Sequence, residues 1–217
     1  MIKGLIFDMD GLMTDTERLF IDIWCQIMQE KGLPEYRDVV TYCIGQDHNE
    51  TFRYVSETIG TDFPYMDYLM EVGSRSVSYC REHGVPVKPG LYELLQFLDE
   101  KGIPYAVATS TKGQMAQWRL DNIGVLDRLH ALVTGDMVSK GKPHPEIFLR
   151  AAELLELPPD ACMVLEDSPH GILAAHRAGC KPVMVPDLKQ PDEEIRSMLF
   201  GCLDSLLDVP EFILANT

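Results

Sequence analysis

The sequence has few positive charges. Its 217 residues include 19 lysines and arginines against 34 aspartates and glutamates, which gives a formal net charge of −15 at pH 7. A chain with this balance is repelled by nucleic-acid phosphates and by anionic membrane surfaces, so we expect neither as a partner. A phosphorylated ligand would need local help from a metal cation or a lysine.

Long apolar runs and paired cysteines are also missing. No stretch approaches the length that crosses a bilayer, and the apolar residues before Asp8 are too few for a signal peptide, so we expect a cytoplasmic protein. The six cysteines form no C-x-x-C pair and have no histidine at zinc-site spacing. We therefore expect reduced, mostly buried thiols. We also expect the protein to be a monomer.

The most informative stretch lies at residues 4–17. Residues 5–7 are apolar and predict the end of a buried strand, and Gly11 predicts the turn that leaves it. Asp8 and Asp10 follow this strand. Side chains two residues apart in an extended segment point to the same side, so both carboxylates can face one hard cation. Taken alone, the pair is equally consistent with an ordinary Asp-Gly turn.

The hydrophobic spacing of residues 16–86 is helical throughout. It predicts helices at 16–31, 35–43, 49–59 and 65–83, with Thr16 as the cap of the first. Such a block is too long for an ordinary connection between two strands. We therefore expect residues 16–86 to be an inserted, all-helical domain.

From residue 91 onward, helices and strands alternate. The predicted helices are at 91–101, 114–123, 145–155 and 169–178, and the predicted strands are at 105–108, 131–134, 162–165 and 182–185. With the first strand, this makes five strands of a parallel sheet that helices cover on both faces. The expected fold class is α/β, with a Rossmann-like core of residues 1–15 and 87–217.

Polar residues follow several of the predicted strands. The carboxyl ends of parallel strands meet at one edge, where open α/β sheets bind ligands. The residues expected there are Asp8, Asp10, Thr109, Ser110, Lys142, Glu166 and Asp167. Acidic groups around Mg²⁺, one lysine, and hydroxyl or amide donors from a turn are suited to a phosphoryl group. Each residue alone has an ordinary explanation as a helix cap or surface side chain, but their joint order favours one site.

Four motifs carry a family resemblance. They are FDMDGL with DTE (residues 7–12 and 15–17), ATS (108–110), GKPHPEIF (141–148) and LEDSPHG (165–171), the last leading into Ala174 and Ala175. The sequence resembles the haloacid dehalogenase superfamily, in the subgroup of β-phosphoglucomutase and small sugar-phosphate phosphatases. The match covers nearly the whole chain, and residues 16–86 stand where such proteins carry a cap domain.

The resemblance implies a Mg²⁺-dependent phosphatase that hydrolyses small phosphomonoesters, of the sugar-phosphate or nucleoside-monophosphate type. Asp8 would form an aspartyl-phosphate, and Asp10 would serve as general acid and then general base. The Thr109 hydroxyl and the Ser110 amide would hold the phosphoryl oxygens. Lys142 would bridge Asp8 and the phosphoryl group and offset their mutual repulsion.

The resemblance also implies a metal site and a specificity loop. Mg²⁺ would be held by the Asp8 carboxylate, the Asp10 backbone carbonyl and Asp167, with Glu166 supporting through a water or a ligating neighbour. The loop in the cap domain that would contact the leaving group contains Gly45, Gln46 and His48. A polar stretch before a helix is also an ordinary solvated turn, so this loop remains open at the level of sequence.

Other functions remain as alternatives. A phosphosugar mutase of the β-phosphoglucomutase type is disfavoured because Phe20 stands where such mutases have a histidine. A carbon–halogen hydrolase needs no metal and would leave Asp10, Glu166 and Asp167 unexplained. A signalling module that stores phosphate on Asp8 would not place an acid/base two residues away. A purely structural protein leaves the set of motifs without a cause.

Overall fold

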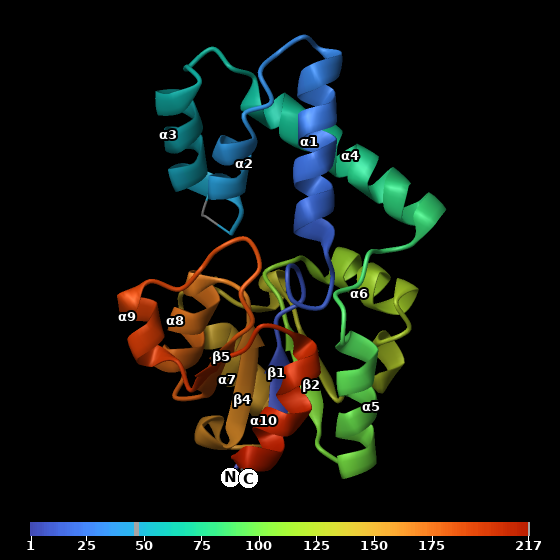
Figure 1. Ribbon diagram of the computed structural model, residues 1–217, viewed down its shortest axis with the longest axis vertical. Coiled ribbons are helices and arrows are strands. Elements are labelled where there is room, and N and C mark those ends of the chain that lie inside the picture. The colour runs from blue at the N-terminus through green and yellow to red at the C-terminus, as the bar shows by residue number, and fades with distance from the viewer. Residues whose placement is uncertain (46–47, 217) are drawn as a thin grey trace. The chain divides into compact units, whose positions relative to one another are not determined.

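Residues 1–14 and 87–217 form one unit around a parallel β-sheet, and residues 15–86 form a second unit of helices (Figure 1). The computed structural model describes residues 1–45 and 48–216, and of residues 48 and 49 it describes the backbone alone. The larger unit, called the core unit below, is therefore assembled from two stretches of chain that the helical unit separates in sequence.

Six parallel strands form the sheet in the described part of the chain. They are β1 (Gly4–Phe7), β2 (Tyr105–Ala108), β3 (Ala131–Val133), β4 (Cys162–Glu166), β5 (Lys181–Met184) and β6 (Gly201–Cys202). Their spatial order is β3-β2-β1-β4-β5-β6, and every neighbouring pair is parallel. The predicted α/β fold class and the five predicted strands are confirmed, and β6 is an additional strand.

The helices of the core unit follow the predicted alternation. They are α5 (Leu91–Lys101), α6 (Gly113–Asn122), α7 (Glu146–Leu154), α8 (Pro169–Arg177), α9 (Glu193–Met198) and α10 (Val209–Ala215), with short 3-10 turns at Leu126–Arg128, Gly135–Met137, Pro159–Ala161 and Leu206–Asp208. The first four begin and end within one residue of the predicted bounds. The last two were not predicted, because a helix of six or seven residues shows less than two turns of hydrophobic periodicity.

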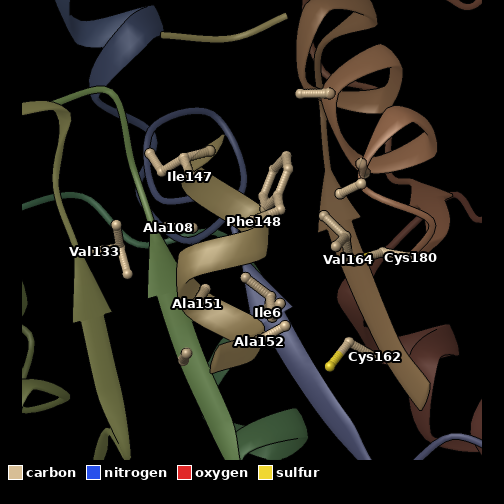
Figure 2. Close-up of a cluster of buried hydrophobic side chains, with 14 of the residues drawn as sticks. Ile6, Ala108, Val133, Ile147, Phe148, Ala151, Ala152, Cys162, Val164 and Cys180 are labelled. Atoms are coloured by element: carbon tan, nitrogen blue, oxygen red, sulfur yellow. The ribbon is translucent and has the colours of Figure 1, made fainter. Parts of the chain in front are cut away.

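Alternate residues of the strands pack against α7 and α8 on one face of the sheet (Figure 2). From β2 these are Ala106 and Ala108, and α7 contributes Phe148 and Ala151 to the same buried cluster. The small side chains let the helix approach the strands closely, and Phe148 fills the remaining space. Because helices cover both faces of a parallel sheet, its strands are continuously apolar, as the sequence of β1 is.

The described part of the helical unit consists of α1 (Thr16–Glu30), α2 (Arg37–Cys43), α3 (His48–Thr58) and α4 (Tyr65–His83). Its aromatic centre is Trp24, whose ring centroid lies 5.8 Å from that of Tyr65 and 6.2 Å from that of Phe63. The indole N–H donates to the Glu35 carbonyl at 2.9 Å. These contacts join α1 to α4 and to the segment before α2, so the unit has a core of its own.

One predicted detail of the helical unit is wrong. Thr16 is the buried first residue of α1, and Asp15 holds the cap position. The backbone N–H of Asp15 donates to the Pro86 carbonyl at 2.9 Å, so the entry of the helix is set by pairing with the returning chain. A tertiary contact therefore replaces the local side-chain cap that the sequence suggested.

The cysteines are mostly buried, as predicted. All six are free thiols, and five of them are buried, whereas Cys202 is exposed. Among the described residues, every helix is too short or too polar to cross a lipid bilayer.

Candidate active site

The register of the central strands sets the position of three polar residues. Phe7 of β1 is opposite Leu165 of β4, so Asp8 and Glu166 come next on adjacent strands. The backbone N–H of Asp8 donates to the Leu165 carbonyl at 3.0 Å. On the other side of β1, β2 is followed directly by Thr109. The order of the strands reverses between β1 and β4, which is the place where open α/β sheets bind ligands.

A tight turn leads the chain away from β1. The backbone N–H groups of Met13 and Thr14 both donate to the Met9 carbonyl, at 2.9 and 3.0 Å. Gly11 lies within this turn at φ +87°, in the left-handed region where side chains are disfavoured. The turn that Gly11 predicted is therefore present, and it keeps Asp10 at the same edge of the sheet as Asp8.

Lys142 lies in the loop between β3 and α7, and hydrogen bonds hold this loop on both sides of it. The Glu146 carboxylate at the start of α7 accepts the backbone N–H and the hydroxyl of Ser139, both at 2.8 Å. From α8, Arg177 donates to the Pro143 carbonyl at 3.0 Å. The loop is thus fixed by residues of its own motif and by the helix that follows β4.

The Lys142 ammonium is buried between two carboxylates. It donates to Asp8 Oδ1, and to Glu166 Oε1 at 2.6 Å, and it lies 4.9 Å from the centre of the Phe148 ring. Its side chain is 7% exposed. Burial lowers the pKa of the Lys142 amine, but Asp8 and Glu166 outweigh this effect and hold the pKa above its ordinary value. Lys142 is therefore a permanent positive charge at the end of β1.

The Asp8 carboxyl is subject to opposing influences. Burial raises the pKa of Asp8, Lys142 lowers it, and the charge of Glu166 raises it again, which leaves it at about 7. A carboxyl group with so high a pKa is typical of functional sites. A bound cation would favour the charged form of Asp8, because an opposite charge nearby stabilises a carboxylate.

Glu166 is held by donors on both of its oxygens. Lys142 occupies Oε1, and the backbone N–H and the hydroxyl of Ser168 both donate to Oε2 at 2.8 Å. Ser168 also caps α8 by accepting the N–H of Gly171 at 3.2 Å. A Cβ atom at Gly171 would lie 1.8 Å from the Glu166 carboxyl carbon, so only glycine leaves space for this side chain. Glu166 therefore orients Lys142.

Three buried carboxylates converge at this edge. Asp8, Glu166 and Asp167 each offer one oxygen, and these oxygens lie within 4.8 Å of one another. Buried charges need partners, and Lys142 is shared between two of these carboxylates, Asp8 and Glu166. Clustered carboxylate oxygens fit a hard divalent cation such as Mg²⁺. Three of the four residues that were predicted to hold a metal are thus brought together, and the fourth, Asp10, follows Asp8 by two residues in the sequence.

The Asp10 carboxylate is held by groups that the sequence did not point to. Arg119 of α6 forms an ion pair with Asp10 Oδ1, and the Thr111 hydroxyl donates to Oδ2 at 2.6 Å. Thr14 adds a longer contact of 3.5 Å to Oδ1. Both oxygens of Asp10 are therefore engaged by donors, two of which come from the segment that follows β2.

Two of the three predicted phosphate-binding residues, Thr109 and Ser110, begin that same segment. Thr109 is buried, and its Oγ1 accepts the backbone N–H of Thr111 at 3.0 Å, which directs its own hydroxyl hydrogen elsewhere. Ser110 is exposed. A Cβ atom at Gly135 would lie 2.2 Å from the Ser110 carbonyl oxygen, so the segment packs closely against the chain after β3. Both residues stand at the carboxyl edge of the sheet.

The predicted specificity loop is described only in part. Gly45 is an exposed residue after α2 at φ +73°, and nothing lies within 4 Å of a Cβ atom placed there. Gln46 lies outside the described residues. His48 is the first residue of α3. The expected role of this loop therefore stays a prediction.

Arg119, Thr111 and Ser168 are the site residues that sequence reasoning missed. Ser168 had a local signal, because a serine directly before a proline is a common start of a helix. Thr111 follows the ATS motif by one residue, but nothing in the pattern distinguishes it from a turn residue. Arg119 had no signal, since an arginine beside the buried Leu120 is also an ordinary polar side chain on a helix.

Comparison with known proteins agrees with this arrangement. A family model described as haloacid dehalogenase-like hydrolase matches residues 5–185. The phosphorylated carbohydrates phosphatase of Thermotoga maritima is 31% identical over 84% of this chain and 84% of its own. The β-phosphoglucomutase of Bacillus subtilis is 30% identical over 82% of this chain and 80% of its own.

A solved structure extends the comparison to three dimensions. It is a HAD family hydrolase from Deinococcus radiodurans R1, crystallised with bound phosphate and sodium. Its TM-score to this chain is 0.80 at 25% sequence identity, and the match covers 99% of this chain and 96% of the other. The similarity therefore extends over both units of the chain.

Proposed function

The chain belongs to the haloacid dehalogenase-like hydrolase family, and we propose that it is a Mg²⁺-dependent phosphatase of small phosphomonoesters, with sugar phosphates or nucleoside monophosphates as substrates. The relatives at 30–31% identity carry the names of a phosphorylated carbohydrates phosphatase and a β-phosphoglucomutase, which supports a phosphate ester as the substrate. The chain groups with the phosphatases that resemble β-phosphoglucomutase.

One observation carries the proposal. The buried Lys142 donates to the Asp8 carboxylate at the end of β1, and oxygens of Asp8, Glu166 and Asp167 lie within 4.8 Å of one another. A structural ion pair would be complete with one carboxylate and one lysine. Three buried carboxylates this close together are suited to a site that binds a cation beside an anionic substrate.

In the first half of the reaction, Asp8 attacks the phosphorus atom. A bond forms between an Asp8 oxygen and phosphorus, and the bond from phosphorus to the leaving oxygen breaks. Asp10 gives a proton to the departing oxygen, so that an alcohol leaves instead of an alkoxide. Lys142, the Thr109 hydroxyl and the Ser110 amide hold the phosphoryl oxygens against the charge of Asp8.

In the second half, water restores the enzyme. Asp10, now a carboxylate, takes a proton from a water molecule that attacks the phosphorus atom. The bond between Asp8 and phosphorus breaks, and inorganic phosphate leaves. The same residue thus donates a proton in one half and accepts one in the other, so the protons balance over the cycle.

Mg²⁺ would be held by Asp8, by the backbone carbonyl of Asp10 and by Asp167, with Glu166 supporting. When bound, the ion supplies positive charge that offsets the repulsion between a carboxylate and a phosphate. Residues 16–86 are proposed to act as a cap domain that supplies substrate contacts from the loop of Gly45, Gln46 and His48. We further propose that the protein acts on its small substrate as a cytoplasmic monomer.

The test is a panel of phosphomonoesters scored by release of inorganic phosphate. It includes hexose phosphates, pentose phosphates and nucleoside monophosphates, each with Mg²⁺ and with EDTA. We expect release from at least one ester with Mg²⁺, loss of release with EDTA, and recovery when excess Mg²⁺ is added. Equal rates with and without EDTA would show that the reaction needs no metal. A lack of phosphate release from every ester would overturn the proposed phosphatase function.

The mutase alternative is tested in the same panel. A sugar monophosphate is supplied with a catalytic amount of a sugar bisphosphate, and both isomer and free phosphate are measured. We expect free phosphate because Phe20 has no proton to exchange. Formation of isomer without free phosphate would replace the phosphatase by the mutase.

A further inference from the structure

Arg119 is a cation of the site that the mechanism above does not use. It is the seventh residue of α6, and its guanidinium forms an ion pair with Asp10 Oδ1. The two side chains are 21% and 20% exposed, so the pair is largely shielded from solvent. An arginine donates hydrogen bonds and accepts none, which makes it a suitable clamp for one oxygen of a carboxylate.

The second oxygen of Asp10 is held from the same segment of chain. The Thr111 hydroxyl donates to Oδ2 at 2.6 Å, while Arg119 holds Oδ1. A carboxylate on a short side chain rotates about its last bond unless both oxygens have partners. Donors on both oxygens therefore fix the plane of the Asp10 carboxyl as well as its position.

The covalent path links these donors to the phosphate-binding residues. Thr109 and Ser110 follow β2, Thr111 comes next, and Arg119 lies further along the helix that this segment opens. Thr111 is also bonded through its N–H to Thr109 Oγ1 at 3.0 Å. One continuous segment thus carries the groups proposed for the phosphoryl oxygens and the groups that orient the acid.

We propose that Arg119, assisted by Thr111, is the positioning residue that aims the Asp10 carboxyl at the leaving-group oxygen. The inference rests on the proposed phosphatase function and adds a residue to it. Proton transfer needs heavy atoms within hydrogen-bond reach, and a small misplacement removes much of the rate.

The proton that Asp10 supplies determines which substrates would be hydrolysed more slowly if Asp10 were misplaced. As the bond from Asp8 to phosphorus forms and the bond to the leaving oxygen breaks, that oxygen takes the proton from Asp10. An alkyl leaving group depends on this proton, because a free alkoxide is strongly basic. A 2,4-dinitrophenolate is a stable anion and leaves without it. A poorly aimed Asp10 therefore slows an alkyl ester and spares an activated aryl ester.

The test compares kcat/KM for two substrates of the full-length protein with Mg²⁺. One is the sugar phosphate that the panel shows to be hydrolysed fastest, and the other is 2,4-dinitrophenyl phosphate. The value of kcat/KM depends only on the steps up to and including the first irreversible one, so it does not include the later attack of water. The variant is Arg119→Met, which keeps an apolar stem of similar length and removes the donors.

Matched variants distinguish a loss of Asp10 orientation from a general loss of structure. Arg128→Met removes another arginine of the core unit, which is paired with Asp99 at 2.6 Å, and it should leave both substrates unaffected. Arg119→Lys restores a charge without the planar fork and should recover part of the rate. Thr111→Val removes the second donor, whereas Thr111→Ser keeps the hydroxyl and should match the parent protein.

We expect Arg119→Met to lower kcat/KM for the sugar phosphate about 10- to 100-fold and to leave that for the dinitrophenyl ester nearly unchanged. Thr111→Val should show the same selectivity with a smaller loss. An equal loss on both substrates, no loss, or a gain on the sugar phosphate would overturn the inference. If the parent protein releases phosphate from no ester, the proposed function fails, and this outcome is distinct from a failure of Arg119.

Discussion

The two units of the molecule each place one cation between two carboxylates, in opposite surroundings. The core unit contains the buried triad of Asp8, Lys142 and Glu166, and the helical unit contains the exposed triad of Glu30, Glu71 and Arg75. The Lys142 side chain is 7% exposed and that of Arg75 is 36% exposed. One separation is equal in the two triads, since Lys142 lies 2.6 Å from Glu166 and Arg75 lies 2.6 Å from Glu71.

The comparison shows that burial, rather than contact distance, distinguishes the candidate active site from a surface ion pair. Around Arg75, hydrogen bonds to Glu30 and Glu71 raise the pKa of the arginine and lower those of the glutamates, as expected for an exposed pair. Around Asp8, burial acts in the opposite direction and raises the pKa of the carboxyl to about 7. Solvent screens the charges of the first triad, whereas the charges of the buried triad interact strongly with one another.

The largest expected effect follows from Asp8→Asn. An amide is a poor nucleophile but still accepts a hydrogen bond from Lys142, so the fold should persist while kcat falls about 10⁴-fold or more. Phosphate release from the best panel substrate is the measurement. Asp121→Asn, an exposed residue of α6, is the control and should retain full activity. Turnover of Asp8→Asn at the parent rate would place the nucleophile elsewhere.

Lys142→Met should have the next largest effect, because it leaves Asp8 and Glu166 buried without their cation. We expect the free energy of unfolding to fall by about 3–5 kcal/mol in EDTA. The loss should be smaller with Mg²⁺, since a bound cation replaces part of the missing charge. Urea unfolding of the parent and the variant, each with EDTA and with Mg²⁺, checks both statements. An unchanged unfolding free energy in EDTA would mean that the buried triad is no more strained than the exposed one.

A pair of helical glycines extends the comparison to packing. Gly171→Ala places a Cβ atom 1.8 Å from the Glu166 carboxyl carbon, so Glu166 must move and Lys142 loses its second partner. We expect a loss of about 1–3 kcal/mol in unfolding free energy, together with reduced turnover. Gly73→Ala in α4 has nothing within 4 Å and should be neutral or stabilising by about 1 kcal/mol. Equal effects at the two positions would contradict the described packing around Glu166.

The smallest effect is expected at the exposed triad. Arg75→Met removes the cation between Glu30 and Glu71, but solvent already screens both carboxylates. The free energy of unfolding, measured with urea, should change far less than it does in Lys142→Met. The small difference should shrink when salt is added. Phosphate release should stay at the parent level. A strong loss of activity would show that the helical unit depends on this triad for function.

Most of the core unit could be predicted from the sequence, because β1 to β5 are short, mainly apolar runs between helical stretches. Helix α5 at Leu91–Lys101 and strand β2 at Tyr105–Ala108 have the bounds that their patterns indicate. The end of the chain could not be predicted in this way. Strand β6 has only two residues, Gly201 and Cys202, and is defined by pairing with β5.

The candidate site also contains residues that the sequence predicted and residues that it did not. Asp8, Lys142 and Glu166 lie in motifs whose order along the chain predicts that they meet, and the strand register brings them together. The partners of Asp10 escaped prediction because Arg119 reaches it from a helix more than a hundred residues away in sequence. Sequence motifs contain the residues that perform the chemistry. The residues that orient them come close only through tertiary packing, so they cannot be predicted from motifs.

Covalent phosphate on Asp8 is the most direct test of the account. In Asp10→Asn with 2,4-dinitrophenyl phosphate and Mg²⁺, the leaving group departs without a proton while water lacks its base. We predict a burst of dinitrophenolate equal in amount to the enzyme, with phosphate located by mass spectrometry on Asp8 in the tryptic peptide of residues 4–18. Phosphate on any other residue, or steady release of phosphate with no covalent adduct, would contradict the account.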